Sequence, residues 1–303
     1  MFGGSGFLGA HVVAAGLERA DLEHPLVSAS RAPEKGPLPA RTASAPELER
    51  VDALEPASVA ALLESWQPAR VVNCLALARV RECERDAVRA SRINAEFPAE
   101  LARWCRRRGA RLVHVSTDMV FGAAPAPPGG FDEDAPPAPL GAYGATKAAG
   151  ERAVLGACPG AIVVRLPLLY GDSGGRGLGA SDSLLAAIAA GERPGLFADE
   201  WRTPLAADDA ARALLELARS DEAGILHVAG PERVSRLQLG LAVLVGRGLP
   251  PAEIGRLVRA RRRAQAGSDP PRPEDTSLDA RRALRLLRTR PSGLRDGIAR
   301  ACS

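Results

Sequence analysis

The chain has 303 residues, of which 46% are hydrophobic, so it can bury a large core. Its 40 basic and 36 acidic residues leave a net charge of only +4, too little to form the basic surface that nucleic acids require. No apolar run approaches the roughly 20 residues that cross a bilayer. These features exclude nucleic acid and membrane as expected partners and favour small molecules.

Cysteine and histidine usage predicts neither disulfides nor a metal site. The five cysteines are scattered, and no two stand at a zinc-ligand or redox spacing: Cys74, Cys83, Cys105, Cys158 and Cys302. The histidines share no metal-ligand spacing either: His11, His24, His114 and His227. No basic leader with an apolar segment opens the chain, so we expect a cytoplasmic protein.

Short apolar runs alternate with helical patterns through the first half of the chain. Runs at residues 25–29, 70–75, 111–116 and 161–166 are typical of buried parallel strands, whereas residues 87–108 and 143–155 have helical spacing. This order predicts an α/β protein with a doubly wound parallel sheet over residues 1–170. The Pro- and Gly-rich residues 123–140 predict a surface loop.

Beyond residue 171 the alternation loosens into a second, smaller lobe. Helical patterns at residues 183–190, 208–219 and 236–246 predict a partly interleaved lobe over residues 171–303. Residues 259–273 are basic, rich in proline and without periodicity, which predicts a mobile loop. At the other end, only Met1 and Phe2 precede a glycine-rich turn, so we expect either a stub of a first strand or an upstream start.

That turn reads Gly-Gly-Ser-Gly-Phe-Leu-Gly and places Gly3, Gly6 and Gly9 at a G-x-x-G-x-x-G spacing before a helical pattern. Glycines permit the tight turn and let the backbone approach a pyrophosphate, which then lies at the positive end of the helix. With the βα order around it, the motif predicts a dinucleotide site that includes Phe7 and Leu8.

The end of the second strand indicates which dinucleotide is bound. An NAD enzyme usually has a carboxylate there, but residues 28–31 read Ser-Ala-Ser-Arg. The planar donor fork of Arg31 suits a 2′-phosphate, so Ser30 and Arg31 favour NADP(H) over NAD(H). Asp52, after the next short strand, is a candidate for the adenine amine, with a helix N-cap as the alternative.

Tyr143 and Lys147 stand four residues apart and hence on one face of a helix. A phenol has a pKa of about 10, and a neighbouring ammonium would lower that pKa, so the pair predicts a proton relay. Thr117 ends a predicted strand at its carboxyl edge, where α/β proteins bind ligands, and its hydroxyl could hydrogen-bond a substrate oxygen.

Taken together, the motifs resemble an extended short-chain dehydrogenase/reductase, and among its branches the dTDP-4-dehydrorhamnose reductase family. The resemblance is carried by residues 3–9, 72–76, 93–95, 115–122, 143–147 and 165–171, with residues 224–230 and 272–279 similar to the family's sugar-nucleotide lobe. It implies a Rossmann domain with a C-terminal substrate-binding lobe. It also implies NADP(H)-dependent reduction of a keto group on a nucleotide-linked deoxysugar.

The resemblance assigns a role to each matching residue. Tyr143 would be the general acid, Lys147 would hold the nicotinamide ribose, Thr117 would orient the carbonyl, and Asp118 would support the site. The residues that would line the cofactor after the next strand are Cys74, Leu75 and Ala76.

Two positions depart from the family pattern. Met119 stands where the family usually has Tyr, and Pro167-Leu168 where it usually has Ser-Trp, which predicts an altered sugar pocket. The residues expected to face the substrate are Met119, Leu168, Arg202 and Arg272.

Alternative functions remain open at this point. One is a sugar-nucleotide epimerase or dehydratase, although Asp118-Met119 lacks the Asp-Glu pair of many dehydratases. Another is a non-catalytic dinucleotide-binding subunit resembling the regulatory subunit of methionine adenosyltransferase. A homodimer is compatible with each of these functions.

Overall fold

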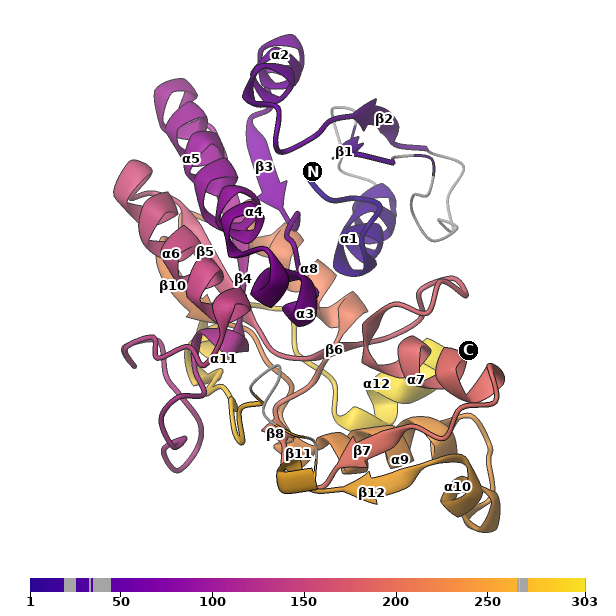
Figure 1. Ribbon diagram of the computed structural model, residues 1–303. Coiled ribbons are helices and arrows are strands. Elements are labelled where there is room, and N and C mark those ends of the chain that lie inside the picture. The colour runs from indigo at the N-terminus through magenta and orange to yellow at the C-terminus, as the bar shows by residue number, and fades with distance from the viewer. Residues whose placement is uncertain (19–25, 33, 35–44, 266, 268–271, 303) are drawn as a thin grey trace.

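A computed structural model describes residues 1–18, 26–32, 34, 45–265, 267 and 272–302 (Figure 1). The helices of the first half are α1 (Phe7–Leu17), α2 (Pro56–Trp66), α3 (Val80–Arg85), α4 (Ala87–Ser91), the π-helical turn η2 (Arg92–Glu96), α5 (Phe97–Arg108), the 3₁₀ turn η3 (Asp118–Val120) and α6 (Ala142–Ala157). Those of the second half are α7 (Gly179–Ala189), α8 (Ala207–Leu217), α9 (Arg236–Gly246), α10 (Pro251–Leu257), the 3₁₀ turn η4 (Arg263–Gln265), α11 (Arg281–Leu286) and α12 (Leu294–Cys302).

The strands fall into one main parallel sheet and several short pairs. The main sheet contains β1 (Val27–Ser30), β2 (Glu47–Arg50), β3 (Arg70–Asn73), β4 (Arg111–Thr117), β5 (Ile162–Leu166) and β10 (Gly224–His227). The short pairs join β6 (Leu169–Tyr170) to β9 (Leu205–Ala206), β7 (Gly195–Phe197) to β12 (Arg259–Arg261), and β8 (Trp201–Arg202) to β11 (Val234–Ser235).

Phe2 joins the two halves of the main sheet. It bridges Ala29 of β1 on one side and Asn73 of β3 on the other, so the order runs β2-β1-Phe2-β3-β4-β5-β10 with parallel pairing throughout. The direction of winding reverses between Phe2 and β3. Ligands of open α/β sheets bind at such a switch point, outside the carboxyl ends of the strands.

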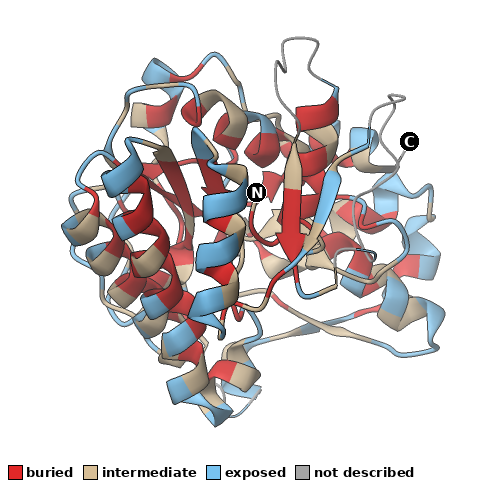
Figure 2. Cartoon of the chain, turned by 90° about the horizontal axis from the view of Figure 1, so that it is seen from above, coloured by how far each residue is buried: buried red, intermediate tan, exposed pale blue. Residues whose placement is uncertain are grey.

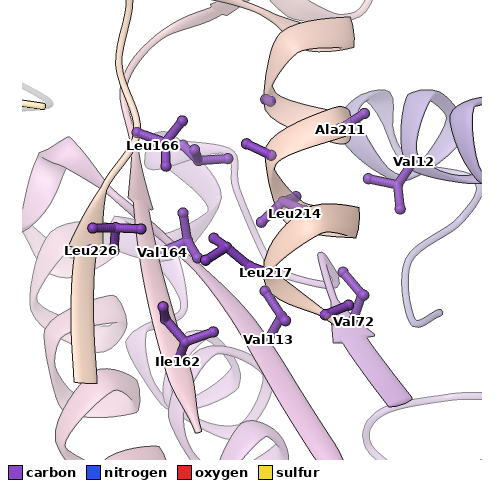
Figure 3. Packing of buried hydrophobic residues seen from close by; sticks show 14 of the residues in the cluster. Val12, Val72, Val113, Ile162, Val164, Leu166, Ala211, Leu214, Leu217 and Leu226 are labelled. Atoms are coloured by element: carbon purple, nitrogen blue, oxygen red, sulfur yellow. The ribbon is translucent and has the colours of Figure 1, made fainter. Parts of the chain in front are cut away.

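Helices cover both faces of the sheet, and the buried residues gather in the strands and the inward sides of these helices (Figure 2). On one face α8 lays Leu214 and Leu217 over Val113 and Val164, with Val12 of α1 beside them (Figure 3). On the other face, α2, α5 and α6 pack against the strands. The alternation of apolar runs and amphipathic helices therefore specifies three layers.

The remaining elements form a cap beside the carboxyl edge of the sheet, built from α7, α9, α10 and α12 with the short strand pairs (Figure 1). The chain crosses between the two parts more than once. After β9 it returns to the sheet through α8 and β10, and residues 272–279 later run back from the cap toward β4. The cap and the sheet are thus tied together by several chain crossings.

The doubly wound α/β fold is confirmed, and one local expectation is corrected. Residues 259–273 do not form a plain loop, because Arg259–Arg261 pairs with β7 and Arg263–Gln265 forms a 3₁₀ turn. Residues 123–140 form the expected surface loop, which is anchored by buried Phe131, whose ring stacks on Phe121 with centroids 4.1 Å apart. His24 and Pro25, the latter being the first residue of the first expected strand, lie outside the described residues.

No helix in the described part of the chain is both long and apolar enough to cross a bilayer. Among the same residues, no three potential metal ligands come together in one place.

Candidate active site

The glycine-rich turn lies at the switch point and leaves no room for side chains at two of its glycines. Gly3 has φ +83°, and a Cβ there would lie 2.8 Å from the backbone nitrogen of Leu75. A Cβ on Gly9 would lie 2.0 Å from the Gly3 carbonyl oxygen. The turn closes where the Gly6 N–H donates to that same oxygen at 2.9 Å, and α1 begins at the next residue. The backbone of the turn is therefore open to an anion at the positive end of α1.

A cavity of about 280 Å³ extends from this turn along the ends of β1, β2 and β3. Its lining includes most of the residues predicted to bind the cofactor: Gly3, Gly6, Ser30, Arg31, Asp52, Cys74, Leu75 and Ala76. The Oγ of Ser30 is buried and has no hydrogen-bond partner within the described structure, while Arg31 is exposed at the rim. A hydroxyl without a partner and a guanidinium in the lining of one cavity fit a phosphate-bearing ribose.

Phe7 and Leu8 were predicted to bind the cofactor, but they are not in the lining of the 280 Å³ cavity. Phe7 lines the neighbouring substrate cleft, whereas the side chain of Leu8 packs into the core under α1. Asp52 lines the 280 Å³ cavity and accepts the Leu54 N–H at 3.0 Å in the turn before α2, whereas the N-cap of that helix is Glu55, so the N-cap alternative for Asp52 is wrong.

A larger cleft of about 810 Å³ lies between the carboxyl edge of the sheet and the cap. It brings together the predicted catalytic and substrate residues Thr117, Asp118, Met119, Tyr143, Leu168, Arg202 and Arg272. Lys147 lies behind them, 2% exposed, and its Nζ donates to the Val115 carbonyl at 2.7 Å. The geometry therefore groups residues that are up to 155 positions apart, from Thr117 to Arg272, around one cleft.

Burial dominates the pKa values of Tyr143 and Lys147, the two residues predicted to form a proton relay. It raises the pKa of Tyr143 above the usual 10, against the lowering effect of a hydrogen bond with Thr117. It also lowers the pKa of Lys147 to about 8, opposed by the Glu151 carboxylate and then by the Cys74 thiol. The expectation of a lowered pKa for Tyr143 is thus not met, because desolvation of the phenolate outweighs the other influences and the net pKa is raised. A phenol with a raised pKa keeps its proton at neutral pH and can donate it.

Asp118 is the centre of a buried hydrogen-bond network beside the relay. Thr117 Oγ1 donates to one carboxylate oxygen at 3.1 Å and Thr276 Oγ1 to the other at 2.6 Å, with Arg202 Nε 3.5 Å from the latter. Burial raises the pKa of Asp118, and these three neighbours counteract that rise. Asp118 consequently connects the 3₁₀ turn η3, which it begins, both to Arg202 of the cap and to Thr276 in the segment at residues 272–279.

The cap side of the cleft carries a cationic cluster, which we define as Arg202, Arg236 and Arg272. Glu200 is buried between them and pairs with Arg272, whose Nη2 donates to Glu200 Oε2 at 3.1 Å. Burial and the two neighbouring guanidinium groups lower the pKa of Arg236 to about 10. Two buried carboxylates, Glu200 and Asp118, stand against the three guanidinium groups, so this wall of the cleft keeps a positive balance.

Comparison with known proteins places the chain in a family. The sequence matches the RmlD substrate binding domain family over residues 1–303. The protein belongs to this family. Similar relatives include a dTDP-4-dehydrorhamnose reductase of Mycobacterium tuberculosis, 40% identical over 191 residues, and one of Mycolicibacterium smegmatis, 34% identical over 248 residues. The expected family resemblance is confirmed.

The RmlD family match covers residues 1–303, whereas the alignments with these relatives cover only part of the chain. The alignment spans 61% of this chain and 61% of the M. tuberculosis protein, and 76% and 69% for the M. smegmatis pair. A Bacillus anthracis dTDP-4-dehydrorhamnose reductase, solved in complex with NADP, superposes with a TM-score of 0.79 at 21% identity, over 99% of this chain and 96% of that chain. The superposition on the B. anthracis structure shows a shared fold.

Sequence reasoning assigned no role to several residues that shape this RmlD-family site. Asn94 lies in the π-helical turn and clamps Leu77 of the cleft wall, with its Oδ1 accepting the Leu77 N–H at 2.9 Å. Its Nδ2 donates to Thr146 Oγ1 at 3.1 Å, beside the relay. A π-turn often marks a functional position, but its presence has no simple sequence signal. Arg236 and Glu200 were missed because only the folded cap brings them to the cleft.

Proposed function

We propose that the protein is an NADP(H)-dependent reductase of a keto group on a nucleotide-linked deoxysugar. The observation that carries this proposal is the position of Thr117 and Tyr143. Both line one cleft that has the glycine-rich turn at one end and the cationic cluster at the other. The names of the mycobacterial relatives support the same reaction.

When bound, NADPH would supply a hydride to the carbonyl carbon. Thr117 and Tyr143 would hold the carbonyl oxygen by hydrogen bonds, which orients the carbonyl and polarises it. Tyr143 would then transfer its phenolic proton to that oxygen, so the C=O group becomes CH–OH and the phenolate remains. Lys147, charged below its pKa of about 8, would stabilise the phenolate until solvent restores the proton.

The cationic cluster would bind the diphosphate of the nucleotide sugar. Guanidinium groups suit phosphate because their planar donor forks make paired, charge-assisted hydrogen bonds. The cluster belongs to the lobe at residues 171–303, which we therefore propose as the substrate-binding part. Residues 1–170 would contribute most of the cofactor site.

The preference for NADP(H) over NAD(H) rests on the end of β1. Ser30 and Arg31 line the cavity there, and no acidic side chain of the described structure appears in its lining except Asp52 at the end of β2. A 2′-phosphate could take both the buried hydroxyl of Ser30 and the exposed fork of Arg31. The NADP complex of the B. anthracis protein agrees with this choice. We also propose that the reaction takes place in the cytoplasm.

The test is to mix the purified protein with NADPH and a dTDP-4-keto-6-deoxyhexose, then follow nicotinamide absorbance and identify the sugar product. The reductase proposal predicts one NADPH oxidised per alcohol formed. Sugar conversion without net NADPH oxidation would instead indicate an epimerase or dehydratase. Binding of NADPH without conversion of any keto-sugar would indicate a regulatory subunit.

A further inference from the structure

The reacting pair Thr117 and Tyr143 is flanked by two apolar side chains at the carboxyl edge of the sheet. Met119 follows Thr117 by two residues in η3. Leu168 follows Leu166 by two residues, and Leu166 is the register partner of Thr117 in the β4–β5 pairing. Both side chains are half-buried and line the cleft. A substrate carbonyl held by Thr117 and Tyr143 would therefore have Met119 and Leu168 beside it.

These flanks also offer few backbone groups for hydrogen bonding. The Met119 N–H donates to Thr117 Oγ1 at 3.1 Å, and the Leu168 carbonyl accepts the Leu205 N–H at 3.1 Å. Pro167 has no N–H to donate. The thioether of Met119 is a weak acceptor, and the side chain of Leu168 has no polar atom. A substrate hydroxyl placed against Met119 and Leu168 would lose its hydrogen bonds to water and form few hydrogen bonds with the protein.

Packing holds the two residues in place. A Cβ on Gly144 would lie 2.0 Å from the Met119 carbonyl oxygen, so the turn at Met119 sits directly on α6 next to Tyr143. Leu168 packs against the cap cluster that contains Tyr170 and Leu239. Neither residue can turn away to expose a polar backbone group without disturbing these contacts.

Two polar side chains of the cleft wall lie on other elements and have partners there. Arg79 pairs with Glu82 on α3 at 3.4 Å, and Ser183 on α7 donates to the Ala180 carbonyl at 3.4 Å. The charged groups of the cap form the cationic cluster defined above, at the end of the cleft suited to the diphosphate. Beside the polar groups of Thr117, Tyr143 and the Asp118 network, the carbonyl therefore has one apolar flank, formed by Met119 and Leu168.

Resting on the proposed function, we propose that the favoured substrate lacks the hydroxyl on the ring carbon next to its keto group. In chemical terms it is a nucleotide-linked keto-sugar with a methylene at that position. An apolar pocket rejects an added hydroxyl by roughly 10²-fold at most, because the buried hydroxyl has no partner. We therefore expect kcat/KM to favour the deoxygenated sugar by about 10–100-fold.

The experiment compares dTDP-4-keto-6-deoxyglucose with dTDP-4-keto-3,6-dideoxyglucose, which differ only in the hydroxyl next to the carbonyl. The ratio of their kcat/KM values is measured with NADPH for the parent protein and for two variants. Met119→Tyr introduces a hydroxyl at the flank and should lower the preference for the dideoxy sugar. Met119→Leu keeps the flank apolar and should retain the preference.

Each outcome has a distinct meaning. Equal kcat/KM values, or a preference for the hydroxylated sugar, would overturn the inference while the reductase proposal stands. An unchanged ratio in Met119→Tyr, with Met119→Leu also unchanged, would overturn the role of this flank. Failure to reduce either sugar while NADPH still binds would overturn the reductase proposal, and the inference would fall with it.

Discussion

The ion pair between Glu151 and Arg165 lies beneath the catalytic edge of the sheet, and breaking it should strongly destabilise the protein. Arg165 of β5 donates through Nε and Nη2 to the two carboxylate oxygens of Glu151 on α6, at 2.9 and 2.7 Å. The side chains are 1% and 3% exposed. Across 2.7 Å, at an effective dielectric constant of about 20, the attraction is about 6 kcal/mol. Desolvation of both groups offsets much of this energy.

Arg165→Met keeps an apolar stem but leaves Glu151 as a buried carboxylate with Ser116 Oγ as its remaining side-chain donor, at 2.5 Å. Removing one partner of a buried pair costs about 3–5 kcal/mol. That is a large share of a typical free energy of unfolding of about 5–15 kcal/mol. Urea unfolding followed by circular dichroism would measure the loss.

Two further variants test whether the loss of stability comes from the unpaired buried charge of Glu151. Glu151→Leu combined with Arg165→Met removes both charges and should recover much of the stability. Arg108→Met breaks the exposed pair with Glu64, whose side chains are 46% and 48% exposed, and should cost less than about 1 kcal/mol. If Arg165→Met were no more damaging than Arg108→Met, or the double variant no more stable than the single one, the reasoning would be refuted.

Four further predictions concern catalysis and cofactor binding. Tyr143→Phe should lower kcat/KM by about 10²–10⁴-fold and leave the Kd for NADPH unchanged, and near-normal turnover would exclude Tyr143 as the acid. Because Lys147 loses its charge above its pKa of about 8, kcat/KM should decline as the pH rises through that value, in contrast to a flat profile if its charge is unimportant. Gly9→Ala places a methyl 2.0 Å from a carbonyl oxygen and should weaken NADPH binding by about 1–3 kcal/mol, measured by calorimetry. Arg31→Ala should weaken NADPH by about 1.5–3 kcal/mol and spare NADH, and equal loss for both cofactors would remove its assignment to the 2′-phosphate.

Local sequence patterns were sufficient to predict the sheet and the parts of the site that each lie within one short segment. The apolar run at residues 111–116 became β4, and the glycine spacing identified a turn that admits no side chain at Gly9. The Tyr143–Lys147 spacing placed both residues on α6. In each instance the periodicity of a helix or strand, or the steric demand of a turn, acts over only a few residues.

Features that depend on distant partners were not predictable in the same way. The strand β12 has the sequence Arg-Ala-Arg, which carries no strand pattern, and it forms because β7 offers a parallel partner. Phe131 is buried although its neighbours are Gly and acidic residues, because Phe121 provides a stacking surface. The pKa of Tyr143 moved opposite to the expected direction, since the depth of burial is set by the whole fold rather than by the nearby lysine.

The hydrogen bond from Thr276 to Asp118 also has a consequence for the order in which the site is assembled during synthesis. Every strand of the main sheet, through β10 at Gly224–His227, leaves the ribosome before Thr276 does. Nascent chains fold from the N-terminus onward, so the sheet and the glycine-rich turn can form early. Asp118, at the start of η3, gains its hydrogen bond from Thr276 only when residues 272–279 return from the cap. A partly made chain could therefore bind a dinucleotide before its acid–base residues are held in their final arrangement.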